Sequence, residues 1–191
     1  MARPARLIPD LTPGTRLALH ACCAPCAGGI ISSLNDAAIA LTVIWANPNI
    51  DEDQEHQRRR DCLQDFCAGL GIPFIDLGYD HPAWLAAIRG LEAEPERGRR
   101  CERCFVLRLQ AAAAWAHTHH HPQLATTLGI GRHKDLEQVN RAGQAAVATC
   151  PDVSFVTHNW RRGGGIERMQ SVASQAGFYR QDYCGCPFAR R

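Results

Sequence analysis

The stretch RLALHACCAPC, residues 16–26, joins a short apolar run to a turn that is dense in cysteine. The run RLALHA (Arg16–Ala21) is followed by this turn, which predicts a buried β-strand. Pro25 interrupts the extended backbone, and a helix is expected to follow over Cys26–Leu34. The first cysteines therefore come directly after a strand. In open parallel sheets, the chemistry gathers beyond the carboxyl ends of the strands.

Strand and helix patterns alternate along the rest of the chain. Four further strands are predicted, and they cover Ala40–Ala46, Ile72–Tyr79, Leu124–Ile130 and Val153–His158. The helices expected between them cover Glu52–Leu70 with Asp51 as N-cap, Pro82–Arg89, Cys101–His117, Leu136–Ala148 and Gly165–Ala176. This alternation predicts an α/β fold with a mostly parallel five-stranded sheet and helices on both faces, Rossmann-like and of the HUP type. Residues 1–191 are expected to form a single domain, with residues 1–15 as an N-terminal lead-in and residues 179–191 as a C-terminal tail.

Size and composition point to an ordinary globular chain. Of its 191 residues, 46% are apolar and 21% are charged. No apolar run approaches the roughly 20 residues of a membrane span, and the first residues lack the apolar core of a secretory signal. We therefore expect a cytoplasmic protein with no membrane partner. The net charge is only +2, but twenty arginines accompany a single lysine, Lys134. Arginine suits phosphate contacts, although a GC-rich genome explains the bias equally well.

Ten cysteines are the strongest chemical signal in the chain. In a reducing compartment, clustered thiols usually serve metal or redox chemistry. Seven of them form three groups: Cys22, Cys23 and Cys26; Cys101 and Cys104; and Cys184 and Cys186. The other three, Cys62, Cys67 and Cys150, are interpreted as buried core thiols.

The spacing of the first two groups is typical of iron–sulfur ligation. A cubane cluster usually takes four thiolates, and a CxxC spacing lets one turn supply two of them. Cys101 and Cys104 begin a predicted helix, whose N-terminus favours the thiolate form. Cys22 and Cys23 are adjacent, so a turn must bring them together. These four cysteines would complete a cubane, while two zinc sites, or one zinc and a redox pair, remain open as alternatives.

Five segments occur in the order and register of one known family. They are LHACCAPC (Leu19–Cys26), NPNI (Asn47–Ile50), CERCFVLRL (Cys101–Leu109), GIGRHKDLEQVNRAG (Gly129–Gly143) and FYRQDYCGC (Phe178–Cys186). With these segments the chain resembles the QueH family of epoxyqueuosine reductases from about residue 16 to residue 187. Two departures, Glu52 where the family commonly has Pro and His56 where it commonly has Tyr, concern the second helix and not the metal site.

The resemblance implies a cytoplasmic oxidoreductase. Such an enzyme reduces epoxyqueuosine to queuosine at the tRNA wobble position, the last step of queuosine biosynthesis, without cobalamin. The resemblance also implies a [4Fe-4S] cluster on Cys22, Cys23, Cys101 and Cys104. Cys184 and Cys186 would be redox-active or would bind a second, mononuclear iron, to which Cys26 is a further ligand. The implied partners are the anticodon loop of tRNA and an electron donor such as ferredoxin or flavodoxin.

The CxC pair admits two chemical roles. A disulfide between Cys184 and Cys186 would close a small strained ring, and such a labile pair can store the two electrons that epoxide removal requires. Alternatively, the two thiolates hold an open iron site that acts as a Lewis acid on the epoxide oxygen. Asp182, next to the pair, is a candidate proton donor to the departing oxygen.

Other residues admit a functional and a structural interpretation. His20 is either a hydrogen-bond partner of a cysteine or a buried core histidine. The tract His117–His121 is either a metal site or, more simply, a solvated helix end. The stretch Arg161–Gly165 is either a phosphate cradle or a flexible loop. Trp160, Tyr179 and Tyr183 are candidates to stack an anticodon base, while core packing explains Trp160 equally well.

Two other functions compete with the reductase. An ATP-dependent tRNA-thiolation enzyme of the PP-loop type shares an α/β sheet and CxxC pairs, but it needs an SGGxDS-type phosphate loop after the first strand. Here that strand runs into Ala21–Cys26 instead, which disfavours nucleotide binding. The other alternative is a zinc-dependent nucleic-acid-binding module without catalysis.

Overall fold

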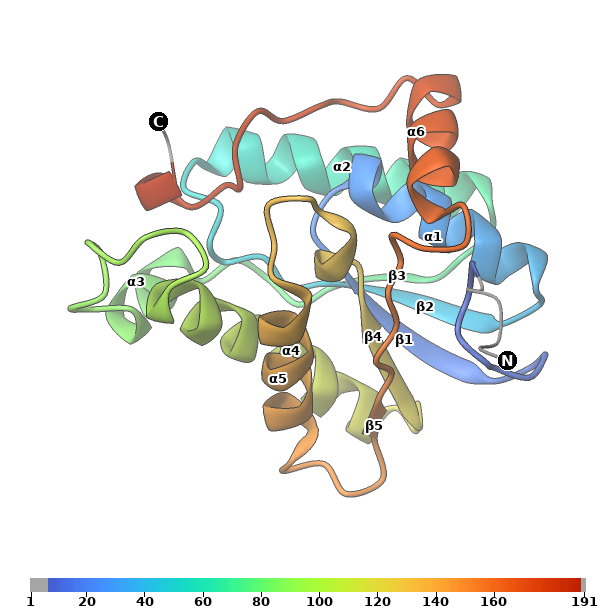
Figure 1. The fold of residues 1–191 in the computed structure, drawn as a ribbon, viewed down its shortest axis with the longest axis horizontal. Helices are drawn as coiled ribbons and strands as arrows, with labels where there is room; N and C mark the ends of the chain where they lie inside the picture. The colour runs from blue at the N-terminus through green and yellow to red at the C-terminus, as the bar shows by residue number, and fades with distance from the viewer. Residues whose placement is uncertain (1–6, 190–191) are drawn as a thin grey trace.

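A sheet of five parallel strands, in the order β3-β2-β1-β4-β5, is the centre of the computed structural model, which describes residues 7–189 (Figure 1). The strands are β1 (Arg16–Ala21), β2 (Ala40–Trp45), β3 (Phe74–Asp76), β4 (Gln123–Thr126) and β5 (Ser154–Phe155). Each pairs with its neighbours in parallel, with Leu17 opposite both Leu41 and Gln123. The predicted α/β class and parallel sheet are confirmed.

Helices cover both faces of this sheet, as predicted. On one face lie α1 (Ala24–Asp36), α2 (Asp53–Gly69) and α6 (Gly165–Gln175), and α4 (Arg99–Thr118) and α5 (Leu136–Val147) lie on the other (Figure 1). The short helices are α3 (His81–Ala87), η1 (Leu128–Ile130) and η2 (Pro187–Ala189).

Alternate residues of β1 explain the two layers, because successive side chains of a strand point to opposite faces. Leu17 and Leu19 belong to the core beneath α1, and Ala18 belongs to the core beneath α4. In the layer of α1, α2 and α6, helices α1 and α6 approach closely at Gly29 of α1. A Cβ at this position would lie 2.7 Å from the backbone of Met169 in α6, so only glycine fits there.

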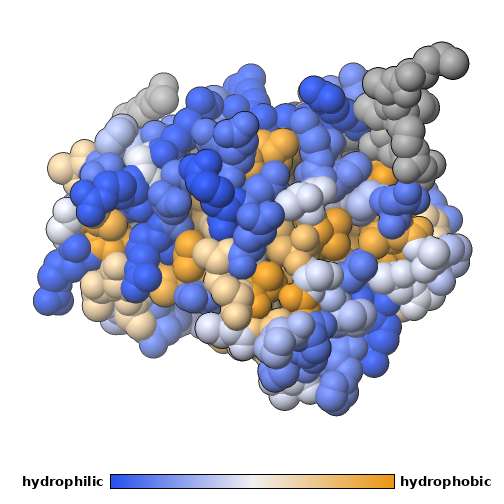
Figure 2. Space-filling model, turned by 60° about the horizontal axis from the view of Figure 1, so that its bottom comes forward, coloured by the Kyte–Doolittle hydropathy of each residue, from blue (hydrophilic) through white to orange (hydrophobic). Residues whose placement is uncertain are grey.

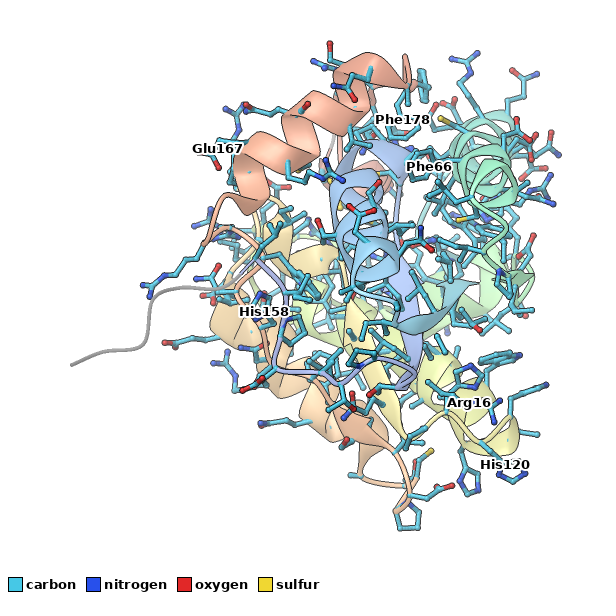
Figure 3. The ribbon with its side chains drawn as sticks, turned by 90° about the vertical axis from the view of Figure 1, so that its right-hand side faces the viewer. Arg16, Phe66, His120, His158, Glu167 and Phe178 are labelled. Carbon is cyan, nitrogen blue, oxygen red and sulfur yellow. The ribbon has the colours of Figure 1, made fainter. Side chains whose placement is uncertain are left out.

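Aromatic residues close the top of this layer. Phe66 of α2 and Phe178, just after α6, meet edge to face with ring centroids 4.9 Å apart (Figure 3). This contact attaches the start of the C-terminal tail to the helical layer. The tail can then run on along α2 toward the cysteines.

Several predicted boundaries are wrong in an informative way. The strand expected over Leu124–Ile130 ends at Thr126, because the Thr126 hydroxyl accepts a hydrogen bond from the Leu128 N–H (3.2 Å) and a 3-10 turn begins. The strands expected over Ile72–Tyr79 and Val153–His158 shorten to three and two residues. The N-cap of α2 is Glu52 and not Asp51.

The order of the strands sets where the site lies. The chain moves outward from β1 to β2 and β3, and then returns to the other side of β1 for β4. In open α/β sheets, ligands bind beyond the carboxyl ends of the strands at such a switch point. Here the switch point lies between β1, which Cys22 follows, and β4, which Thr127 follows.

Hydrophobic and hydrophilic residues are mixed on the face that Figure 2 shows, where hydrophobic areas appear between hydrophilic ones. Within residues 7–189, only Leu70, Leu85 and Phe188 are large hydrophobic residues that count as exposed. None of the described helices has both the length and the apolar character needed to cross a membrane.

Candidate metal centre

The first three cysteines converge where β1 passes into α1. The sulfur atoms of Cys22, Cys23 and Cys26 all lie within 4.8 Å of one another. Cys23 is the extended N-cap residue of α1 (φ −173°, ψ 154°), and Pro25 fits the first helical turn, where no N–H is needed. Cys26 then returns on the same side as Cys23, three residues on.

Hydrogen bonds among the three thiols favour the thiolate form of Cys22 alone. Hydrogen bonds from the thiols of Cys23 and Cys26 hold the pKa of Cys22 well below its usual range. The pKa values of Cys23 and Cys26 are raised, in each case chiefly through their hydrogen bonds with Cys22. Gln181 Nε2 lies 2.7 Å from Cys23 Sγ, so the C-terminal tail closes over this group.

The second pair lies on the first two turns of α4. Cys101 and Cys22 each pack against the core cluster that contains Phe105, while Cys104 is buried in a separate cluster with Cys186. Burial raises the pKa of Cys104, and the charge of Arg108 partly opposes that rise. The expectation that the helix N-terminus favours the thiolate is therefore wrong for Cys104 without metal, because desolvation outweighs the helix dipole.

The CxC turn is attached to the loop that follows β2. Gly185 has φ +98°, in the left-handed region, and a Cβ there would lie 2.9 Å from Ile50 Cγ1 and 3.1 Å from Arg59 Nη1. The Asp51 N–H donates to the Gly185 carbonyl at 2.9 Å. Glycine is therefore needed between Cys184 and Cys186 both for its conformation and for its lack of a side chain.

The two cysteines of this turn have different surroundings. Cys184 is half-buried and accepts a hydrogen bond from Lys134 Nζ at 3.1 Å. Cys186 is buried, which raises the pKa of its thiol to about 11. All ten cysteines are free thiols in the structure.

Two cations lie among the three cysteine groups. Arg108 is 2% exposed, donates to the Ala46 carbonyl and to Asn47 Oδ1, and favours the thiolates of Cys22 and Cys104. The charge of Lys134 favours the thiolate of Cys26, and the pKa of Lys134 is in turn raised by Cys184 and Cys101, although burial opposes this. These charges offset the negative charge that several thiolates would bring into a buried site.

A cavity of about 860 Å³ opens over these groups at the carboxyl end of the sheet. Its size is that of pockets that hold small molecules. Its walls combine sulfur, cationic and aromatic groups and include Cys22, Cys26, Cys184, Arg59, Arg108, Arg132, His133, Lys134, Asp182 and Tyr183.

Comparison with known proteins gives the family of the chain. The sequence model of the family described as Epoxyqueuosine reductase QueH matches residues 17–191. The chain belongs to the QueH family. It is 41% identical over 176 residues to Epoxyqueuosine reductase QueH of Histophilus somni and to that of Haemophilus influenzae, covering 92% of this chain and 72% of each relative. The QueH of Acinetobacter baylyi is 38% identical, covering 92% of this chain and 81% of the relative.

A solved structure shares the fold. The U34-tRNA thiolase NcsA from Methanococcus maripaludis, determined with its [4Fe-4S] cluster, has a TM-score of 0.60 at 15% identity. The match covers 97% of this chain and 65% of that chain. The likeness places QueH and this thiolase on one architecture, but β1 of the present chain still leads into cysteines and not into a phosphate loop.

Several residues outside the three cysteine groups have structural roles. His20 is fully buried between Thr126 Oγ1 (2.8 Å) and the Ala46 carbonyl (3.3 Å), which makes it a core histidine. Trp160 is 3% exposed and its indole N–H donates to the Thr126 carbonyl. Cys67 and Cys150 are buried in the core, and Cys62 packs against it.

The histidine tract lies at the opposite end of the molecule. Arg16 begins β1 and donates to the His119 carbonyl at 3.0 Å, and Arg16 and His120 lie at the same end in Figure 3. His117 pairs with Asp152 at the exposed end of α4, whereas His121 is buried against Thr42. The solvated-end interpretation therefore holds for His117, and no group of metal ligands occurs in this tract within the described residues.

Arg161 contacts the backbone of the loop that carries Lys134. Its guanidinium donates to the carbonyls of Gly131 and Lys134, both at 2.6 Å, and so holds the backbone from which Lys134 projects. Tyr179 donates to Glu55 at 2.8 Å beside α2, and is not part of the cavity wall. Tyr183 is part of that wall, and its ring lies 5.0 Å from the guanidinium carbon of Arg59.

Sequence reasoning missed Arg108 and the position of Lys134. Arg108 follows Cys104 by four residues on one helix, a spacing that places both on the same face. The sequence spacing was therefore enough to place Arg108 beside Cys104. The position of Lys134 depends on the distant Arg161 and had no local signal.

Proposed function

We propose that this chain reduces epoxyqueuosine in tRNA to queuosine, using iron held by its three cysteine groups. The observation that supports this most is the gathering of cysteines, the buried Arg108 and the partly buried Lys134 around one cavity in a chain of the QueH family. The reaction consumes two electrons and two protons. Both C–O bonds of the epoxide break, a C=C bond forms in the cyclopentyl ring, and the oxygen leaves as water.

The donor set fits an iron–sulfur cluster. Cys22, Cys23, Cys101 and Cys104 are the proposed ligands of a [4Fe-4S] cluster, which would supply electrons one at a time when bound. An all-sulfur donor set with nearby cations suits such a cluster better than it suits magnesium or calcium, which prefer oxygen. Seven cysteines also exceed the four ligands of one structural zinc site.

The remaining cysteines have a separate role. Cys26, Cys184 and Cys186 would bind a second iron, or Cys184 and Cys186 would cycle between dithiol and disulfide. The contact between Lys134 and Cys184 supports either version, because an ammonium stabilises a thiolate. Iron analysis distinguishes them, since a second iron site raises the count from four to five irons per chain.

The cavity is the proposed binding site for the wobble nucleotide. Arg132 and His133 are exposed on its rim and would bind phosphate of the anticodon loop. The wobble base of an unpaired loop can be turned outward at low cost and stacked on an aromatic ring, and Tyr183 is the proposed ring. Asp182, exposed in the cavity wall, remains the candidate proton donor.

The cellular setting follows from this reaction. An enzyme that acts on tRNA and holds reduced thiols would work in the cytoplasm. A low-potential donor such as ferredoxin or flavodoxin would deliver the electrons.

Complementation tests the proposal. The gene would be expressed in a strain that lacks epoxyqueuosine reductase, and the tRNA nucleosides would be analysed by mass spectrometry. We expect queuosine to replace epoxyqueuosine. Persistent epoxyqueuosine, despite cluster-loaded protein, would reject the function and leave the iron site standing.

Cysteine variants test the division of roles. We expect Cys→Ser at Cys22, Cys23, Cys101 or Cys104 to remove or degrade the cubane, because oxygen ligands hold such clusters less well than thiolates. The same change at Cys184 or Cys186 should leave the cubane and abolish turnover, and Cys62→Ser should do neither. Equal iron loss in all six site variants would contradict these assignments.

A further inference from the structure

An indole N–H without a partner lies next to the proposed cluster ligands. Trp84 of α3 is 2% exposed and packs in one cluster with Ile88, Cys104 and Cys186. Its Nε1 atom is buried and has no hydrogen-bond partner among residues 7–189. An unpaired buried donor is costly and uncommon in native proteins, so this one needs an explanation.

Cys104 is the proposed ligand of the [4Fe-4S] cluster that packs together with Trp84. The Trp84 side chain packs with Cys104 and lowers the pKa of its thiol as a hydrogen-bonding group, although no formed hydrogen bond joins the indole N–H to the neutral thiol. A thiolate bound to iron is a better acceptor than a thiol, because it carries charge. The donor is therefore satisfied once Cys104 becomes a ligand.

The indole is held in this orientation by a row of rings. Trp84 stacks on His81 with centroids 5.4 Å apart, and His81 stacks on Tyr79 at 5.9 Å. His81 Nδ1 also lies 2.7 Å from the Pro48 carbonyl. Asp80 caps the same helix by accepting the Ala83 N–H at 2.9 Å. These contacts hold the Trp84 ring against the cluster that contains Cys104.

We propose that Trp84 donates a hydrogen bond to the Cys104 sulfur of the bound cluster and thereby raises the reduction potential of that cluster. Hydrogen bonds to the sulfurs are among the factors that set such potentials. The reduced cluster carries one more negative charge than the oxidised cluster, so the bond stabilises the reduced form more. Trp84 is thus a positioning and tuning residue. This inference rests on the proposed assignment of Cys104 as a cluster ligand.

The first experiment is a redox titration of the holoenzyme and of Trp84→Phe. Phenylalanine keeps an aromatic ring in the cluster but lacks the N–H. We expect the ratio of reduced to oxidised cluster at a fixed potential to fall about tenfold, which corresponds to about 59 mV for a one-electron couple. Trp45→Phe is the matched control, because it removes another buried indole N–H, which donates to His56 Nε2 at 2.9 Å. Its potential should equal that of the parent.

The result that decides the second measurement is read from the parent protein. The parent protein is labelled with ¹⁵N at the indole nitrogen of its four tryptophans, the cluster is reduced, and pulsed EPR is recorded. We expect a hyperfine coupling to one ¹⁵N nucleus, which Trp84→Phe removes and Trp45→Phe retains. A reducible parent cluster with no such coupling would overturn the inference and leave the reductase proposal intact. A parent that holds no reducible cubane would contradict the cluster assignment, and this inference with it.

Discussion

Replacing Gly185 by alanine should release the Cys184–Cys186 turn while the cluster ligands stay in place. Gly185 has φ +98°, where an L-residue costs roughly 1–2 kcal/mol. The added Cβ would also lie 2.9 Å from Ile50 Cγ1, and overpacking of this kind costs about 1–3 kcal/mol. The docked tail should therefore lose roughly 2–5 kcal/mol relative to an undocked tail.

Gly177→Ala is the matched control. Gly177 also has a left-handed φ, +61°, but nothing lies within 4 Å of the Cβ position. It therefore carries the backbone strain alone, about 1–2 kcal/mol. The difference between the two variants isolates the close approach of the turn to Ile50 and Arg59.

Hydrogen exchange at Asp51 is the assay. The Asp51 amide donates to the Gly185 carbonyl, so its exchange reports undocking of the tail. The two variants differ by the overpacking cost of about 1–3 kcal/mol, so we expect exchange in Gly185→Ala to be about 5- to 150-fold faster than in Gly177→Ala, since each 1.4 kcal/mol is a factor of ten. Visible absorbance should be retained and turnover should be lost. An Asp51 amide that stays as protected as in the parent, with turnover unchanged, would refute the reasoning.

Two further predictions concern Lys134 and His20. Lys134→Met should reduce turnover more than about tenfold while iron content is retained, because the charge-assisted hydrogen bond to Cys184 is lost. Lys134→Arg should recover part of the activity. Full activity of Lys134→Met would contradict a role for Lys134 in stabilising the Cys184 thiolate. Burial, with a smaller contribution from Arg108, lowers the pKa of His20 to about 3. In the metal-free protein, between pH ~6.5 and about 3, His20 is therefore protonated in the unfolded state but not in the folded state. The contribution of His20 to the free energy of unfolding is complete above pH ~6.5 and is lost as the pH falls toward 3, at about 1.4 kcal/mol per pH unit. Urea unfolding at pH 6.5 and pH 5 should show a loss of about 2 kcal/mol that His20→Gln lacks; equal losses in both proteins would exclude His20 as the cause.

Local pattern was enough for the elements that carry the first cysteines. The strand predicted over Arg16–Ala21 has those bounds in the structure, because an apolar run between two turns leaves little choice of register. Helix α5 begins at Leu136 as predicted, and Asp135 caps it by accepting the N–H groups of Glu137 and Gln138. Cysteine spacing located the site at the end of β1 for the same local reason.

Long-range contacts decided what the sequence could not predict. The position of Lys134 depends on hydrogen bonds from Arg161, which follows it by 27 residues. The CxC turn depends on the contact of Gly185 with the loop after β2, more than 130 positions earlier in the chain. The unpaired N–H of Trp84 depends on the packing of α3 against α4, which no local sequence pattern predicts. Periodicity and capping signals do not extend over such separations.

The most direct test of the central claim is conversion of the substrate by the purified protein. The reconstituted enzyme would be incubated anaerobically with tRNA that contains epoxyqueuosine and with a low-potential reductant, without cobalamin or ATP. Nucleoside mass spectrometry should show loss of epoxyqueuosine and an equal gain of queuosine, with two electrons consumed per molecule. Unchanged epoxyqueuosine in the presence of a fully loaded, reducible cluster would contradict the account.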